Sequence, residues 1–77
     1  MAFFFFLWDD ETVQHIAEHG VTQEEFAEVV EFPETTGFSR SSGRPFAIGT
    51  TSTGRTLFCA YEKVDEIYLR PVTASEI

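Results

Sequence analysis

The segment Leu57-Phe-Cys-Ala-Tyr61 decides the fold, because it is the most apolar stretch in the part of the chain that has an extended pattern. It lies within the predicted strand Arg55–Glu62 and is apolar at both odd and even positions. A strand with two apolar faces is typical of the middle of a sheet. We therefore expect a central strand, bounded by turns at Ser52-Thr53-Gly54 and Lys63-Val64-Asp65.

Further strands are predicted on both sides of this segment, at Gly37–Ser41, Arg44–Thr51 and Glu66–Val72. The dipeptide Ser42-Gly43 supplies the turn between the first two. In the last strand, side chains alternate, so Ile67 and Leu69 point to one face. Tyr68 and Arg70 point to the other face.

Two acidic helices are predicted before these strands. Asp9 or Asp10 can cap a helix that runs to about His19 and ends at Gly20, with an apolar stripe of Val13, Ile16 and Ala17. The next helix starts at the capping box Thr22-Gln-Glu-Glu25 and ends near Glu31, before Pro33. Val21 is placed to pack on Phe26; Phe26, Val29 and Val30 form the buried face, and Glu24, Glu25, Glu28 and Glu31 face water.

The two ends of the chain give further expectations. Phe3–Trp8 is rich in strand-forming residues at every position and is predicted to be a buried strand. Thr73-Ala-Ser-Glu76 matches a second capping box and predicts the start of a helix. The order is then β-α-α-β-β-β-β, a single α+β domain over residues 1–77 with two helices packed on one face of a mostly antiparallel sheet. So small a core predicts modest stability unless the chain forms a homo- or hetero-oligomer.

The charge of the chain is unevenly distributed. Thirteen acids and five bases give a formal net charge of −8 for 77 residues. Residues 1–34 hold nine acids and no Lys or Arg, so any anion site must be built from the second half. An acidic total argues against a protein that coats nucleic acid over an extended surface.

Cys59 cannot form an internal disulfide and lies in the most apolar strand, so we expect a core thiol. The apolar run Ala2–Trp8 has no basic region before it and is far too short to span a bilayer. We therefore expect a cytoplasmic protein without a membrane segment.

One metal-binding pattern is present. His15-Ile-Ala-Glu18-His19 matches the H-x-x-E-H motif of some zinc peptidases, and two histidines four residues apart share a helix face. A zinc site needs a further ligand, however, and the following helix offers only glutamates. Solvent-facing histidines at a helix end are the favoured interpretation, and no metal or cofactor is expected.

The arginines are the main candidates for a functional site. Arg40, Arg44, Arg55 and Arg70 all lie in the strand region, and the arginine fork suits bidentate contacts with phosphate. Tyr61 and Tyr68 could stack on exposed bases. The alternative is that these arginines pair with the helical glutamates and serve only solubility and stability.

From Trp8 to Glu76 the chain resembles the BrnT family, small toxins of type II toxin–antitoxin systems with a RelE-like fold. The resemblance rests on Trp8-Asp9, His15-Ile-Ala-x-His19-Gly-Val-Thr22, Glu25, Glu28-Val29, Gly43-Arg44, Ile48-Gly-x-Thr-x-x-Gly-Arg55-x-Leu-Phe58 and Val72-Thr-Ala-x-Glu76.

The resemblance implies a metal-independent endoribonuclease that cleaves mRNA and is silenced by a cognate antitoxin. Arg44 and Arg55 match the family's basic sheet positions, and Arg70 lies near its last one; these three are the catalytic candidates. Arg40, Tyr61 and Tyr68 are the RNA-binding candidates. The chain departs from the family in its purely acidic helices and short C-terminus. These departures support an alternative, a non-catalytic module that docks an antitoxin-like protein.

Overall fold

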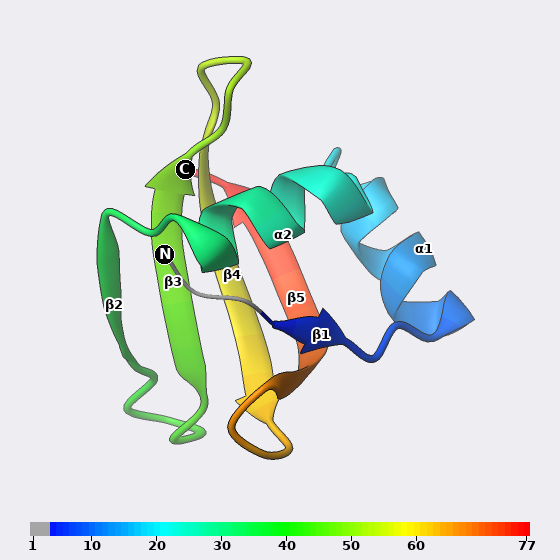
Figure 1. The fold of residues 1–77 in the computed structure, drawn as a ribbon. Helices are drawn as coiled ribbons and strands as arrows, with labels where there is room; N and C mark the ends of the chain where they lie inside the picture. The colour runs from blue at the N-terminus through cyan, green and yellow to red at the C-terminus, as the bar shows by residue number, and fades with distance from the viewer. Residues whose placement is uncertain (1–3) are drawn as a thin grey trace.

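The apolar segment around Cys59 lies in the middle of the sheet, as predicted. A computed structural model describes residues 4–77 (Figure 1). Its elements are β1 (Phe5–Phe6), α1 (Asp10–Glu18), α2 (Gln23–Glu31), β2 (Thr35–Phe38), β3 (Pro45–Thr50), β4 (Thr56–Lys63) and β5 (Tyr68–Glu76). The five strands have the spatial order β1-β5-β4-β3-β2, so β4 is central. Neighbouring strands are antiparallel except for β1, which pairs with β5 in parallel.

Both helices lie on one face of this sheet, which confirms the two-layer α+β architecture (Figure 1). Their starts are fixed by local hydrogen bonds that the sequence predicted. The Thr12 N–H donates to Asp9 Oδ1 at 2.8 Å, and the Glu25 N–H donates to Thr22 Oγ1 at 3.1 Å. The Thr22 N–H in turn donates to the Glu25 carboxylate, which completes the capping box.

The core lies between the helices and the sheet. Phe26 on α2 is fully buried, and its ring meets those of Trp8 and Phe6 edge-on at centroid distances of 5.3 and 6.1 Å. From the sheet, Leu57, Cys59 and other buried side chains complete the layer. The predicted apolar face of α2 is confirmed. On α1 only Ile16 is buried, whereas Ala17, expected in the same stripe, is exposed.

The N-terminal strand is shorter and more exposed than predicted. The expected strand Phe3–Trp8 includes Phe3, which lies outside the described residues, and only Phe5–Phe6 is a strand. Phe6 packs against the core, whereas the Phe5 side chain is 59% exposed and Leu7 39% exposed. The expectation of a strand buried on both faces is wrong, because the helices cover only one face and β1 is an edge strand.

The C-terminal segment also differs from its prediction. Thr73–Glu76 does not begin a helix but continues β5, in register with β4 from Leu57↔Glu76 to Ala60↔Thr73. Ala74 is completely buried there. A capping box needs only four residues, but pairing with the central strand forms a ladder of backbone bonds and buries Ala74. Among residues 4–77, no helix has the length and apolar character needed to cross a membrane.

Candidate functional site

The three arginines predicted to be catalytic do not meet. Arg44 directly precedes β3, and Arg55 directly precedes β4. Since these strands are antiparallel, with Thr50 opposite Thr56, their starts lie at opposite ends of the sheet. At about 3.3 Å per residue, Arg44 and Arg55 lie roughly 20 Å apart along the strands. One phosphate cannot touch both.

Arg55 is held by two carboxylates in an ion-pair network. Its Nη1 donates to both oxygens of Glu25 at 2.9 Å, and its Nη2 and Nε donate to Glu76 Oε1 at 3.2 and 3.3 Å. The hydrogen bonds that Arg55 donates to Glu76 raise the pKa of Arg55, with a further contribution from Glu25. Glu25 and Glu28 were expected to face water. Instead Glu25 binds Arg55, and Glu28 accepts a hydrogen bond from the Ser52 N–H at 3.0 Å.

The network joins three elements that are far apart in sequence: the first turn of α2, the start of β4 and the end of β5. The buried residue Thr51 holds the backbone of Arg55 in place. The Arg55 N–H donates to Thr51 Oγ1, and the Thr51 N–H donates to the Arg55 carbonyl. Glu25 also serves the capping box of α2. Arg55 therefore has a structural role, since Nε, Nη1 and Nη2 of its guanidinium all donate hydrogen bonds to carboxylates of the protein.

We expect Arg55→Met, which keeps the length of the side chain but removes its charge, to lower Tm by about 4–8 °C, the shift that the loss of one interaction of ordinary strength produces in a domain of this size. Thermal unfolding followed by circular dichroism measures it. Arg44→Met is the matched control, because Arg44 is exposed and forms no salt bridge within residues 4–77. Equal Tm values for the two variants would contradict the structural role of Arg55.

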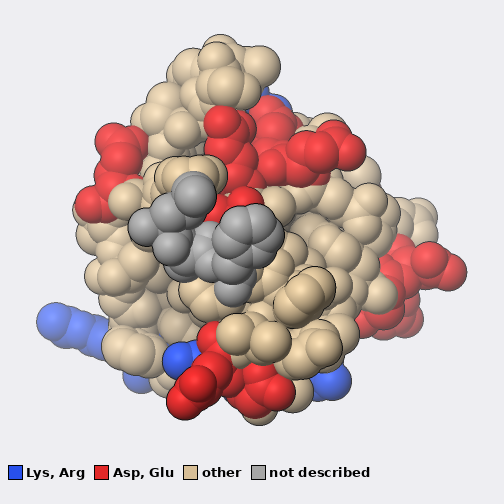
Figure 2. Space-filling model, in the orientation of Figure 1, with Lys and Arg blue, Asp and Glu red and all other residues tan. Residues whose placement is uncertain are grey.

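The other four bases lie toward the opposite end of the sheet. Arg40 and Arg44 belong to the β2–β3 turn, Lys63 ends β4, and Arg70 lies opposite Glu62 across the β4–β5 ladder. No salt bridge within residues 4–77 includes any of them. Figure 2 shows Lys and Arg atoms around this lower end, interspersed with acidic side chains, while other acids gather at the top.

A hollow of about 480 Å³ opens among these turns. Arg44, Tyr61 and Lys63 line it together with Glu62, Phe38 and Pro45. Partial burial raises the pKa of the Tyr61 hydroxyl, so this group keeps its proton at neutral pH. The hollow therefore combines two cations with one carboxylate, Glu62, a protonated phenol and apolar walls. Its lining carries one net positive charge, which suits a phosphate ester with an attached ring.

Short turns position the cations. The Gly43 N–H donates to the Ser39 carbonyl, and the Ser39 N–H donates to the Arg44 carbonyl. Gly43 has φ 71°, a left-handed conformation that closes this turn and favours glycine. In the β4–β5 turn, Asp65 Oδ1 accepts hydrogen bonds from the N–H groups of Ile67 and Tyr68. Arg44 and Lys63 thus lie next to turns that are held by hydrogen bonds.

The remaining RNA-binding candidates are more scattered. The Tyr68 ring stacks on Phe5 at a centroid distance of 5.3 Å, so one of its faces is already covered. Arg40 is exposed at the tip of the β2–β3 turn. Arg70 acts on an acid of the helix layer instead. Hydrogen bonding from Thr12 is the largest cause that lowers the pKa of Asp9, and the positive charge of Arg70 lowers it further. Of the predicted set, the hollow contains only Arg44 and Tyr61.

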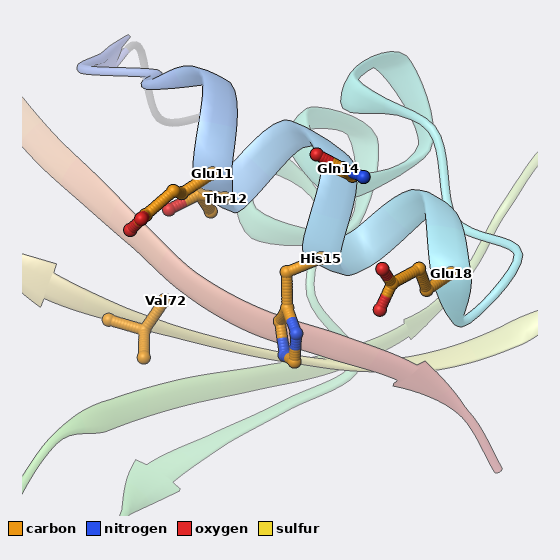
Figure 3. Close-up of a pocket in the computed structure, with 6 residues that line it drawn as sticks. All are labelled: Glu11, Thr12, Gln14, His15, Glu18 and Val72. Atoms are coloured by element: carbon orange, nitrogen blue, oxygen red, sulfur yellow. The ribbon is translucent and has the colours of Figure 1, made fainter.

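The histidines of α1 lie elsewhere, beside a second, shallow hollow between α1 and β5. Figure 3 shows this hollow, with His15 pointing from α1 toward β5 and Val72 lying on that strand. His15 Nε2 shares a hydrogen bond of 2.9 Å with Thr73 Oγ1, and the His15 and His19 rings are 5.0 Å apart. Within residues 4–77 no three His, Cys, Asp or Glu side chains are grouped to hold a metal.

Cys59 is fully buried on the helix side of β4, as expected for a core thiol. Burial, with a smaller contribution from the Glu25 charge, raises its pKa to about 12. A thiol that keeps its proton and has no access to solvent is a poor nucleophile.

Sequence reasoning missed Lys63 and Phe38 as parts of the hollow, although one signal was present. In an antiparallel hairpin the start of one strand lies beside the end of the next, which places Arg44 near Lys63 and away from Arg55. Comparisons with protein-family models, curated proteins and solved structures found no match to this chain.

Proposed function

We propose that this protein is a BrnT-like toxin component of a type II toxin–antitoxin system, cytoplasmic, that binds mRNA at the hollow beside Arg44. The observation that carries the proposal is the pairing of Arg44 and Lys63 with Tyr61 in one hollow. Neither cation has a carboxylate partner within residues 4–77, so both are free to contact a phosphate.

The chemistry open to such a site is metal-independent cleavage of RNA. A ribose 2′-OH gives its proton to water and attacks the adjacent phosphorus, the bond from phosphorus to the 5′ oxygen breaks, and a 2′,3′-cyclic phosphate and a 5′-OH result. Arg44 and Lys63 would stabilise the negative charge that develops on the phosphate oxygens. The Tyr61 hydroxyl, protonated at neutral pH, would donate its proton to the leaving 5′ oxygen.

Binding should be local and weak, because the whole protein carries a charge of −8. The field of the acids opposes the approach of RNA and can lower association rates by about ten- to a thousandfold. Only the few nucleotides that reach the hollow gain favourable contacts. A short single-stranded segment therefore suits the site better than a duplex.

A second candidate is the non-catalytic docking module. The engagement of Arg55 by Glu25 and Glu76 favours it, because this removes one matched basic position from any RNA site. In this case the chain would bind an antitoxin-like protein and leave RNA uncut. A partner encoded beside this gene and co-purifying with it, together with intact RNA, would support the docking role.

The test uses purified full-length chain and a labelled single-stranded mRNA fragment at about 50 mM salt, with EDTA present. Each charged contact with a phosphate contributes about 1.5–3 kcal/mol, so Arg44→Ala should weaken binding at least tenfold. The double variant Arg44→Ala, Lys63→Ala should weaken it about a hundredfold and abolish cleavage.

Arg70→Ala is the matched control, since it removes one positive charge from a position that does not line the hollow. We expect it to change affinity less than about threefold. The proposal fails if Arg44→Ala binds and cuts RNA as the unmodified chain does. RNA that is bound but never cut would favour the docking role over catalysis.

A further inference from the structure

The face of the sheet opposite the helices is apolar at one edge. Leu69 is buried beneath the helices, so its neighbours Tyr68 and Arg70 project from the other face. Phe6 likewise packs into the core, and Phe5 and Leu7 project to the opposite side. The stack of Phe5 on Tyr68 shows that these side chains meet on that face.

The middle of the same face is also apolar. Ala47, Leu57 and Cys59 are buried on the helix side, so the residues between them project from the other side. Phe46 and Phe58 meet there at a centroid distance of 5.1 Å. Together with the edge residues they form what we call the open face: Phe5, Leu7, Phe46, Ile48, Phe58 and Tyr68. Both helices of residues 4–77 lie on the opposite side of the sheet (Figure 1).

We propose that two copies of this chain associate through their open faces, sheet against sheet, around a twofold axis. Aromatic and aliphatic side chains would form the centre of this interface, and threonines such as Thr35 and Thr56 its rim. This composition is typical of protein–protein interfaces, which are rich in aromatic residues at the centre and polar at the edge. The proposal does not depend on the RNA site.

The charges of the open face favour a second copy over nucleic acid. Glu62 and Arg70 lie opposite each other on β4 and β5, so the strands of this face carry one acid and one base. A twofold axis can place Arg70 of one copy against Glu62 of the other. It also puts the acidic helix layers on the two outer surfaces, where their repulsion is weakest. An RNA would meet no excess of cations on these strands.

The size of the face is typical of a weak interface. Five strands at about 4.8 Å spacing and about six residues of strand length cover roughly 500 Å² per copy. Two copies would bury about 1,000 Å², near the lower limit for a specific interface. We therefore expect a reversible dimer with a dissociation constant of order 10⁻⁶ M.

Sedimentation equilibrium over concentrations up to about 500 µM tests this with the full chain. The apparent mass should rise from 8.7 kDa toward twice that value. Raising NaCl from about 50 to about 500 mM should strengthen the dimer, because salt screens the repulsion between two copies of charge −8.

Phe5→Glu should raise the dimer dissociation constant at least tenfold, since it places a charge in the apolar interface. Phe38→Glu is the matched control. Phe38 is 75% exposed. Gly37 pairs with Phe46 and so faces the open face, and its neighbour Phe38 therefore projects from the other side of β2. It should change the constant less than about threefold. Arg70→Glu should also weaken the dimer, and the charge swap with Glu62→Arg should restore it.

A mass that stays at 8.7 kDa at every concentration and salt would overturn the proposal. So would equal weakening by Phe5→Glu and Phe38→Glu, because the interface would then lie elsewhere. The partner could instead be a single-stranded RNA or a protein encoded beside this gene. If such a partner binds one copy of this chain, and binds Phe5→Glu less tightly, the open face belongs to that partner.

Discussion

Phe26→Ala is expected to destabilise the domain by about 3–5 kcal/mol, the range found when a buried aromatic side chain is truncated in a core. Phe26 is fully buried and is the point at which α2 meets the N-terminal segment, through the rings of Phe6 and Trp8. Removing the ring loses its burial and leaves a cavity between helix and strand. A domain of 77 residues has about 4–12 kcal/mol of stability, so this one substitution removes a large fraction of it.

Urea unfolding at 25 °C measures this change, with circular dichroism for the whole domain and Trp8 fluorescence for the cluster. Phe32→Ala is the control, because Phe32 follows α2 and its side chain is 57% exposed. Its loss should stay below about 0.5 kcal/mol. Phe26→Leu, which keeps a bulky apolar group, should lose less than Phe26→Ala. Equal losses for Phe26→Ala and Phe32→Ala would contradict the core assigned here.

The second large effect is a loss of stability at alkaline pH that depends on Cys59. Burial raises the pKa of this thiol from 9.0 to about 12 in the folded protein. Between these two values the unfolded chain releases the proton while the folded chain keeps it. The unfolded state then binds fewer protons, so stability falls as pH rises, and it is unaffected by this group below pH 9.

One pKa unit corresponds to 1.36 kcal/mol, so Cys59 should remove about 2 kcal/mol of stability by a pH near 10.5 and about 4 kcal/mol at most. Urea unfolding at a series of pH values, compared between the unmodified chain and Cys59→Ala, isolates this contribution. Other groups that titrate in this range, Tyr61 among them, contribute to both proteins alike. Identical pH slopes would show that the thiol is not held in its protonated form.

The two helices could be predicted because their signals are local. A capping box such as Thr22-Gln-Glu-Glu25 needs only hydrogen bonds between residues three apart, and the buried positions of α2 follow from helical spacing. The central position of β4 followed from its two apolar faces for a similar reason. Apolar residues at both odd and even positions are a property of composition, which can be read without knowing the partner strands.

The candidate site was predicted only in part. The sequence identified Arg44 and Tyr61, but it grouped Arg44 with Arg55, which lies at the other end of the sheet. The alternative, in which arginines pair with helical glutamates, holds for Arg55 with Glu25. Which arginine would find a carboxylate depends on contacts between residues 30 positions apart, and residue spacing alone does not give these.

By itself the sequence determined the element types, their order and an acidic helical layer, because propensity, capping and composition act over a few residues. The tertiary structure alone decided three further features: the continuation of β5 through Thr73–Glu76, the exposure of Phe5, and the pairing of Arg55 with Glu25. Each of these depends on which strands pair and which face the helices cover. Such long-range pairing can override a local pattern, since a ladder against β4 stabilises more backbone than one helix cap does.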